Sequence, residues 1–467
     1  MEDEHFAEYL EKSLESIFRI NSRTAHTLQS NDPSEVKTVI ESTLPIKGKP
    51  FNELLVQFES NIAPFLNQNR GANYAAYITG SGNPIGAIAE FIKAYFNQNG
   101  LKWNNSPIAS ELEQLMIRWV SDFCLLDGFK KGVLTSGGSM SNLMALHFAL
   151  ARKIPDREHN GFYSQKPLTV YCSEETHSSI ERAMVFLGLG RKYLRKVPVD
   201  EKFQIRIDLL ETVITQDINE GYEPLALVGN AGTTNTGSID NLEALATIAK
   251  KFNLWYHVDG AYGLPARRIP ELHGAFEGIE LADSIIVNPH KWMYVPFEAS
   301  CVLVHEIPKA IHFSPNYLMT ENADKRWESS EHTIELSKEF RALKIWFTLT
   351  YYGVDQLTGF IKQDIELTNY LAEQLQIHGF EVNPNHPLSI LCFRYQDTKR
   401  SNSDIEVINQ RLLLHIETDG RIFLTGTKIN GSTYLRTYFG NPSRTRQNVD
   451  FMISTIIELL MIEPQPE

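Results

Sequence analysis

The chain has 467 residues, of which 42% are hydrophobic and 22% are charged; this profile is typical of a globular protein that is long enough for two domains. Its 44 basic and 57 acidic residues give a formal net charge of -13, which argues against a nucleic-acid-binding protein, because such a protein needs a basic surface patch. No apolar stretch is long enough to span a bilayer, and the acidic N-terminus is unlike a secretory signal peptide, so we expect a soluble cytoplasmic protein.

Residues 1–72 predict an N-terminal helical segment. Apolar side chains recur there at a helical period, and prolines at positions 33, 45 and 64 break the run into shorter helices. The apolar positions are Phe6, Leu10, Leu14, Ile17 and Phe18. Because little local core is available to cover this face, we expect the helical arm to pack on a second copy of the chain.

From about residue 110, short apolar runs alternate with helical stretches. The pattern strand, turn, helix, strand is the signature of an α/β domain with a largely parallel sheet. A long helical run begins at about residue 335, and a smaller α+β domain follows it. We therefore predict an N-terminal helical segment (1–72), a large domain (73–353) and a small C-terminal domain (354–467).

The predicted strands all end in small or polar residues, at 136–139, 173–177, 230–234, 259 and 288–291. In a parallel sheet, ligands bind outside the carboxyl ends of the strands. We therefore expect these five segments to meet at one site.

The turn "TSGGSMSN" (135–142) follows the first of these strands. Its two glycines let backbone N–H groups approach an anion, Ser139 adds a hydroxyl, and the next helix contributes its positive N-terminal end. The turn matches neither the P-loop nor GxGxxG. It indicates a phosphate cradle or, in the simpler interpretation, a helix cap at Ser139 or Ser141.

Asp259 and His177 each allow two interpretations. An aspartate at a strand end commonly caps a turn, but a buried carboxylate that faces a pyridine nitrogen keeps that ring protonated and makes it an electron sink. The small Ala261 nearby leaves room for a flat ring. His177 is either a cap residue or a flat partner for such a ring. Because no second ligand lies at metal-binding spacing and the four cysteines form no ligand pattern, we expect no metal and reduced, buried thiols.

Lys291 lies in "VNPHKWMYVP" (287–296), directly after a predicted strand. Most lysines are solvated surface residues. Among large apolar neighbours, however, loss of water lowers the pKa of the amine and favours the neutral form that attacks a carbonyl. Together with the cradle, the acid and the flat side chain, such a lysine describes a site for pyridoxal 5′-phosphate.

The segments described above, with others in the same order along the chain, match those of a known family. The sequence resembles the group II pyridoxal-phosphate decarboxylases, which include aromatic L-amino-acid, glutamate, histidine, tyrosine and diaminobutyrate decarboxylases. The resemblance implies a fold-type I architecture, a homodimer with active sites at the interface, and decarboxylation of an L-amino acid to an amine and CO2. The matching blocks are "SPIASELE" (106–113), "GVLTSGGSMSNLMAL" (132–146), "YCSEETHSSIERA" (171–183), "GNAGTTNTGSIDNL" (229–242), "HVDGAYG" (257–263), "NPHKW" (288–292) and "FRALKIWFTLTYYG" (340–353).

The resemblance also implies roles for individual residues. It makes Lys291 the Schiff-base lysine, Asp259 the partner of the pyridine nitrogen, and His177 the ring-stacking histidine. Ala261 is then the small residue under the ring, and Thr233 lies near the phenolic oxygen of the cofactor. The phosphate contacts that the resemblance implies are Gly138, Ser139 and Asn288, with His290 beside them.

One loop departs from the family pattern. In this family, a loop before the long helix often carries a tyrosine that protonates the α-carbon. Counting back from the helix places that position at Ser329 in "YLMTENADKRWESSEHTIEL" (317–336), whose only tyrosine is its first residue. Protonation then falls to His332, His177 or water, or the carbanion reacts with oxygen and the product is an aldehyde.

The substrate side chain is addressed by two segments, residues 73–82 and 101–103, which match the substrate pocket of the family. Their apolar residues suit an aromatic amino acid, and they suit a protein core equally well. For an acidic substrate, the available basic groups are Arg70 and Lys102. We expect an aromatic amino acid, with a pocket formed by Tyr74, Tyr77, Ile78, Leu101 and Trp103.

Two other functions compete with a decarboxylase. An aminotransferase or desulfurase shares the lysine and the aspartate, but not "THSSIERA" followed by "NPHKW". A catalytically silent binding protein on the same fold has no physical reason to keep Lys291, Asp259 and His177 together. We therefore predict an enzyme of the carboxy-lyase class.

Overall fold

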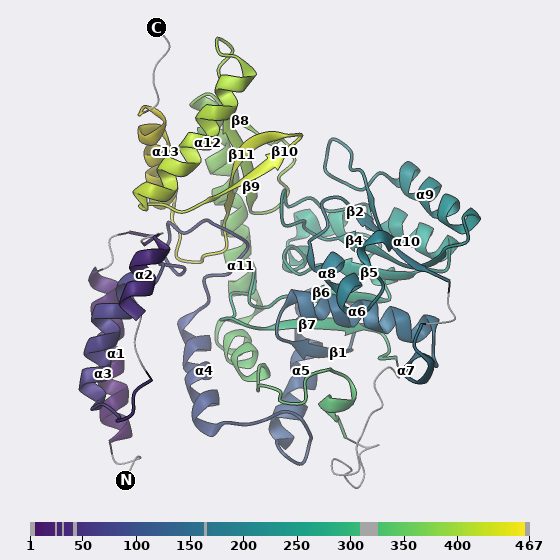
Figure 1. The fold of residues 1–467 in the computed structure, drawn as a ribbon, viewed down its shortest axis with the longest axis horizontal. Coiled ribbons are helices and arrows are strands. Elements are labelled where there is room, and N and C mark those ends of the chain that lie inside the picture. The colour runs from purple at the N-terminus through teal and green to yellow at the C-terminus, as the bar shows by residue number, and fades with distance from the viewer. Residues whose placement is uncertain are drawn as a thin grey trace.

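A seven-stranded sheet is the centre of the fold in the computed structural model, which describes residues 5–23, 26–29, 32–40, 44–162, 166–308 and 326–462 (Figure 1). The strand order is β1-β7-β6-β5-β4-β2-β3, and within the described residues only β7 runs antiparallel to its neighbours. This arrangement confirms the predicted α/β architecture. The strands are β1 (Lys131–Thr135), β2 (Leu168–Ser173), β3 (Leu194–Val197), β4 (Glu223–Asn230), β5 (Trp255–Asp259), β6 (Ser284–Val287) and β7 (Ser300–Val304).

Helices cover both faces of this sheet. Neighbouring residues of β4 reach both buried layers, with Leu227 in one and Val228 in the other. One layer contains α6 (Gly138–Lys153) and α8 (Ser179–Phe186); the other contains α5 (Pro107–Phe123), α9 (Ile207–Asn219) and α10 (Leu242–Lys251). The remaining short elements are α7 (Arg157–Asn160) and 3-10 helices at Arg191–Tyr193, Leu264–Arg268, Pro270–Phe276 and Ile279–Leu281.

A helical arm lies beside the sheet domain at the start of the chain (Figure 1). The Phe6 ring packs on Phe91 and Tyr95 of α4, with ring centroids 5.9 and 5.1 Å apart. Phe18, on the predicted apolar face, is nevertheless 70% exposed. That this apolar face packs on a second copy of the chain stays a prediction. The arm consists of α1 (Phe6–Arg23), α2 (Pro33–Ile40), α3 (Phe51–Gln57), a π-helix (Phe58–Ile62) and a 3-10 turn (Ala63–Phe65), and α4 (Pro84–Phe96) follows it.

A smaller antiparallel sheet, in the order β10-β11-β9-β8, forms the C-terminal part of the fold. The long helix α11 (Ala342–Ile377) connects it to the large sheet and bends at Gly353, where φ is 69°. The predicted domain boundary at residues 353 and 354 stays a prediction. The other elements are β8 (Phe380–Val382), β9 (Ile390–Tyr395), α12 (Asn402–Asp419), β10 (Thr425–Ile429), β11 (Ser432–Tyr438) and α13 (Arg446–Leu460).

The start of α11 differs from the prediction. The sequence predicts helix from about residue 335, but the structure has only a 3-10 turn (Ser329–Glu331) and irregular chain before Ala342. The reason is tertiary: the Lys338 amine is buried, and it donates hydrogen bonds to Glu113 and Ser329, both at 2.7 Å. These contacts override the helical preference of the segment. No helix in the described parts of the chain is long and apolar enough to cross a membrane.

Candidate active site

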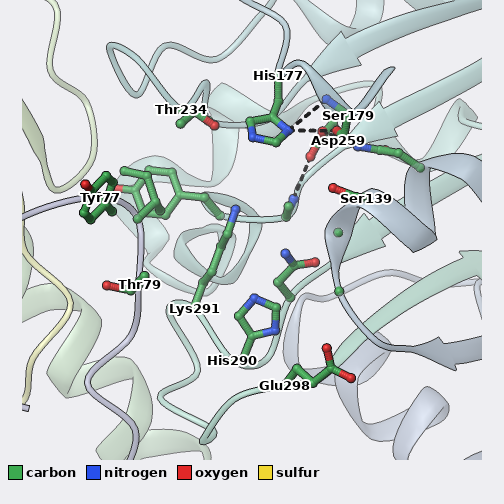
Figure 2. Close-up of a pocket in the computed structure, with 18 of the residues that line it drawn as sticks. Tyr77, Thr79, Ser139, His177, Ser179, Thr234, Asp259, His290, Lys291 and Glu298 are labelled. Atoms are coloured by element: carbon green, nitrogen blue, oxygen red, sulfur yellow. Dashed lines mark hydrogen bonds between the residues drawn. The ribbon is translucent and has the colours of Figure 1, made fainter. Parts of the chain in front are cut away.

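A cavity of about 690 Å³ opens where the carboxyl ends of the parallel strands meet (Figure 2). The strand-end segments that the sequence singled out lie around it, together with Tyr77, Ile78 and Thr79 from the chain before α4. The structure thus brings together every cofactor-site residue predicted from the sequence. These residues are Gly138, Ser139, His177, Thr233, Asp259, Ala261, Asn288, His290 and Lys291.

The glycine-rich turn at the start of α6 forms one end of the cavity. A Cβ at Gly138 would lie 2.8 Å from the Asn288 amide nitrogen, so only glycine fits there without displacing a neighbour. The Ser300 hydroxyl donates to the Asn288 amide oxygen at 2.6 Å, which leaves the amide nitrogen directed at the turn. First-turn N–H groups of α6 and this amide therefore converge as donors for an anion.

His290 adds a donor to the same end. The Ala299 N–H donates to His290 Nδ1 at 3.1 Å, so the ring carries its proton on Nε2. Burial lowers the pKa of His290 to about 3, and the imidazole is therefore neutral at working pH. The cradle consists of neutral donors, in keeping with the interpretation as a phosphate site.

Asp259 ends β5 on the floor of the cavity. Its Oδ1 accepts from the Ala261 N–H at 3.1 Å, and its Oδ2 accepts from the Asn142 amide at 2.9 Å. Two donors from different elements fix the plane of this carboxylate, which is 8% exposed. The small Ala261 side chain lines the cavity beside it, as expected for a site that accepts a flat ring.

His177 projects into the cavity from the turn between β2 and α8. Its Nδ1 accepts from the Ser179 hydroxyl at 2.8 Å and from the Ser179 N–H at 3.2 Å. Burial lowers the pKa of His177, against the opposing charge of Asp259. Figure 2 shows the His177 ring and the Lys291 amine directed into the same space.

Lys291 follows β6, and its backbone is fixed on both sides. Gly80 packs on the Lys291 carbonyl with no room for a Cβ. The next residues are held by Asp364 of α11, which accepts from Trp292 Nε1 at 3.0 Å and from the Tyr294 hydroxyl at 2.7 Å. Burial lowers the pKa of the Lys291 amine, and the nearby Asp259 carboxylate opposes this effect. The chain thus presents one amine with a depressed pKa on a rigid loop.

Thr79 and Arg436 also line the cavity, but sequence reasoning did not single them out. The Thr79 hydroxyl is buried. Arg436 on β11 donates to the Thr234 carbonyl at 3.1 Å and to the Thr425 hydroxyl at 3.2 Å. Both lie far in sequence from the strand-end motifs, and an arginine within an amphipathic strand gives no local signal of function.

Arg70 and Lys102, the two basic residues considered for an acidic substrate, do not line the main cavity. Lys102 is buried, with its amine 3.7 Å from Glu328 and 3.4 Å from Glu331. Arg70 borders a separate, smaller cavity that Tyr352 also lines. Among the described residues, Arg436 is the arginine that lines the main cavity.

Other predicted pocket residues do not reach the cavity of their own chain. Tyr74 is buried against Phe423, with ring centroids 5.5 Å apart. The Ser330 N–H donates to the Leu101 carbonyl at 3.1 Å, and the Trp103 N–H donates to Glu328 at 3.2 Å. His332 stacks on Trp327 at 4.3 Å. Roles of Leu101, Trp103 and His332 in catalysis stay predictions.

Ser329 occupies the position at which the family often has a tyrosine. Its side chain is fully buried and its hydroxyl accepts from the Lys338 amine at 2.7 Å. The loop's own tyrosine, Tyr317, lies outside the described residues. No tyrosine occurs in the described part of this loop, from residue 326 to the start of α11.

Comparison with known proteins decides the family. The model of the "Pyridoxal-dependent decarboxylase conserved domain" matches residues 33–396. The chain belongs to the pyridoxal-dependent decarboxylases. It is 29% identical to the aromatic-L-amino-acid decarboxylase of Bacillus atrophaeus, over 90% of this chain and 87% of that protein. It is also 29% identical to a phenylacetaldehyde synthase of a Rosa hybrid cultivar, over 88% and 84% of the two chains.

Solved structures agree with this assignment. The tryptophan decarboxylase of Catharanthus roseus, in complex with L-tryptophan, has a TM-score of 0.91 at 26% identity and covers 99% of both chains. The decarboxylase is thus a carboxy-lyase that acts on amino acids with pyridoxal phosphate. The site fits that cofactor, because the Gly138 cradle leaves space that a Cβ would fill, and Asp259 and His177 offer the acceptor and the flat ring.

Proposed function

We propose that this decarboxylase converts an aromatic L-amino acid to the corresponding amine and CO2. The observation that carries the proposal is the convergence of Lys291, Asp259 and His177 on one cavity with an anion cradle at its end. Aromatic and apolar groups at the other end, Tyr77 and Ile78, support an aromatic side chain. Relatives named for aromatic amino acids support the same class.

In this proposal, the chain holds the cofactor from three sides. Gly138, Asn288 and His290 bind its phosphate through neutral donors. Asp259 accepts from its pyridine nitrogen, and His177 covers one face of the ring. When bound, pyridoxal phosphate supplies an aldehyde that condenses with amines and a ring that accepts the electron pair released with CO2.

The remaining work belongs to side chains of the protein. Burial keeps a share of the Lys291 amine neutral and thus nucleophilic. The Arg436 guanidinium and the Thr79 hydroxyl are placed to receive the substrate carboxylate and orient the bond that breaks. The Nε2–H of His177 then lies on the cavity side, available for a hydrogen bond or proton transfer to substrate.

A homodimer completes the site in this proposal. Large apolar side chains are exposed on the arm and on α4, where Phe18 is 70% and Phe96 is 64% exposed. A second copy that covers this surface also offers a place for Leu101, Trp103 and His332 at the partner's cavity. Their contacts with the loop in one chain leave them outside its own cavity.

An aldehyde-forming reaction is the second candidate, and the buried Ser329 favours it. If no tyrosine protonated the α-carbon, dioxygen would accept the two electrons left by CO2 and would become hydrogen peroxide. Water then releases ammonia from the resulting imine. The balance is amino acid, O2 and H2O giving aldehyde, CO2, NH3 and H2O2. One relative is a phenylacetaldehyde synthase, whose name gives an aldehyde as its product.

The test is turnover in sealed vials with a panel of aromatic, acidic and basic L-amino acids. Protein loaded with pyridoxal phosphate is incubated with and without oxygen, and CO2, amine, aldehyde, ammonia and peroxide are measured together. Equal CO2 and amine from an aromatic amino acid, independent of oxygen, is the expected result. Equal amounts of aldehyde and peroxide, formed only when oxygen is present, would show that the protein catalyses the second reaction instead. Turnover of acidic or basic amino acids alone would overturn the proposal of an aromatic substrate.

A further inference from the structure

Asn142 on α6 lines the cavity and lies at the centre of a buried hydrogen-bond network in its wall. Its amide nitrogen donates to Asp259 Oδ2 at 2.9 Å and to the Ser179 hydroxyl at 2.7 Å. Its amide oxygen lies 2.8 Å from His257 Nε2. The side chain is 1% exposed, so these three contacts satisfy it without solvent.

The far side of the network sets the direction of the hydrogen bonds. An amide oxygen only accepts, so His257 Nε2 carries the ring proton. His257 Nδ1 lies 2.8 Å from the Ser284 hydroxyl and 3.2 Å from the Ser284 carbonyl. With the ring proton on Nε2, Nδ1 accepts from the nearer hydroxyl, and that hydroxyl accepts from Trp255 Nε1 at 2.7 Å. Burial lowers the pKa of His257 to about 4, which keeps the ring neutral and this order intact.

The near side continues to the stacking histidine. Because the Ser179 hydroxyl receives a hydrogen from Asn142, its own hydrogen is free to point to His177 Nδ1 at 2.8 Å. His177 Nδ1 also accepts from the Ser179 N–H. A neutral His177 with an accepting Nδ1 has its proton on Nε2, the nitrogen left for the cavity.

We propose that Asn142 is a positioning residue that fixes two groups of the cofactor site at once: the plane of the Asp259 carboxylate and the Nε2–H tautomer of His177. A reversed amide would set the Asn142 oxygen against a carboxylate oxygen, and His257 holds the amide against that reversal. The consequence for the cofactor rests on the proposed function, whereas the tautomers are properties of the protein alone.

The experiment reads both groups separately. Solid-state 15N NMR of histidine-labelled holoenzyme gives the tautomer of His177, whose signals are identified by their loss in His177→Gln. Equilibrium dialysis gives the dissociation constant of pyridoxal phosphate. The wild type is expected to show neutral His177 protonated on Nε2. In Asn142→Leu, which has a similar volume but no donor, the Ser179 N–H remains the one fixed donor to His177 Nδ1. The share of the Nδ1-protonated tautomer is therefore expected to rise from that in the wild type, and the cofactor binds about tenfold more weakly or worse.

Two further sets of variants keep the test valid if Asn142→Leu does not fold. Ser179→Ala removes only the hydroxyl that links Asn142 to His177. His177 is therefore expected to show a mixture of tautomers, while cofactor affinity changes less than in Asn142→Leu. His257→Leu removes the donor to the Asn142 oxygen and is expected to act like Asn142→Leu. His257→Gln restores an N–H donor and is expected to recover most of the wild-type behaviour.

The matched control is Asn409, a buried asparagine of α12 that donates to the carbonyls of Tyr395 and Ile405 at 3.0 and 2.8 Å. Asn409→Leu is expected to lower the thermal midpoint without changing the His177 tautomer or cofactor affinity. Wild-type tautomer and affinity in Asn142→Leu, or in both Ser179→Ala and His257→Leu, would overturn the proposal. Absence of CO2 release from any amino acid would instead count against the proposed function and would leave the tautomer result unaffected.

Discussion

Arg436 gives the cavity a cation that the strand-end motifs do not provide. Hydrogen bonds to the Thr234 carbonyl and the Thr425 hydroxyl hold the guanidinium in place. Burial lowers its pKa from the usual arginine value, but a guanidinium stays charged at any working pH. A substrate carboxylate is the anion that such a group would orient.

Replacing Arg436 with Gln is expected to raise KM for the amino acid by about 10- to 100-fold, the loss of one hydrogen bond to a charged group. Initial rates of CO2 release measure the effect. Arg436→Lys, which keeps the charge but not the planar fork, should recover part of it. Arg421→Gln, on an ion pair with Glu458 away from the cavity, is the control; an unchanged KM in Arg436→Gln would contradict the assignment.

Lys291 is the residue without which no turnover is expected. Lys291→Ala should lower CO2 release by at least about 10³-fold, as loss of a catalytic nucleophile does. The thermal midpoint of Lys291→Ala should not fall, because burial disfavours the charged amine that this variant removes. Residual turnover within tenfold of wild type would show that another amine takes its place. Lys250→Ala, on exposed α10 surface, serves as the matched control.

Local motifs predicted the residues that stand at strand ends, because each of those segments combines a buried strand with a chemically special residue. Thr79, Asn142 and Arg436 escaped this reasoning. Asn142 and Arg436 are ordinary side chains in their own segments, and they become significant through Asp259 and Thr234, which lie 117 and 202 positions away. Pairings of this kind are set by the packing of elements and are not encoded in local sequence patterns.

At the scale of elements, the start of α6 shows why the turn before it contains glycine. The first-turn N–H groups of a helix lack partners inside the helix, and they attract an anion. A side chain at Gly138 would fill the space between these groups and the Asn288 amide, which lies 2.8 Å from the position of a Cβ. The cradle thus depends on the absence of a methyl group.

Gly138→Ala is therefore expected to weaken binding of pyridoxal phosphate by about tenfold or more, in line with an overpacking cost of roughly 1–3 kcal/mol. Equilibrium dialysis measures the dissociation constant. Gly359→Ala, in α11 with open space around its Cβ position, is the matched control and should stabilise the fold by about 0.4–1 kcal/mol. Equal cofactor affinity in the two variants would place the phosphate elsewhere.

Elements with strong periodicity were predictable, whereas the start of the long helix was not. Helix was expected from about residue 335, yet buried Lys338 holds the chain before Ala342 against α5, and buried Lys102 contacts the preceding turn. Neither lysine is marked by its local sequence as a residue that will be buried, even though Lys102 lies between Leu101 and Trp103. Only the positions of their carboxylate partners, Glu113 and Glu328, explain the result.

At the scale of the whole molecule, buried neutral histidines make stability depend on pH. Burial lowers the pKa of His290 to about 3 and that of His257 to about 4, whereas an unfolded chain has histidine pKa values of about 6.5. The unfolded state therefore takes up protons that the folded state does not. The stability that each histidine contributes is present above about pH 6.5 and is lost as the pH falls towards its folded-state value.

Each of these histidines should make the apoprotein about 2 kcal/mol less stable at about pH 5 than at about pH 7.5. Urea unfolding at fixed chain concentration measures the difference. In His290→Gln, the loss on acidification should shrink by about that amount. His378→Gln, at an exposed site, should behave like the wild type; an unchanged loss in His290→Gln would mean that this ring titrates in the folded state.

The proposed dimer predicts complementation between two inactive chains. If Trp103 acts in the partner's cavity, a hybrid of one Lys291→Ala chain and one Trp103→Asp chain contains one cavity with both residues intact. Such hybrids, prepared with two affinity tags, are expected to recover about half of the wild-type CO2 release per dimer, whereas each parent homodimer stays inactive. Inactive hybrids would place Trp103 in the cavity of its own chain, and a monomer in light scattering would remove the proposal altogether.

Asp364 lies on the half of α11 that follows the Gly353 bend, and its carboxylate holds the two side chains that come just after Lys291, Trp292 and Tyr294. The part of the long helix that continues into the smaller sheet's side of the molecule therefore contacts the segment directly after Lys291. The Asn83 amide donates to the Tyr294 carbonyl at 2.9 Å from the opposite side of that segment. The conformation of the chain at Lys291 thus depends on residues from both ends of the sequence as well as on β6.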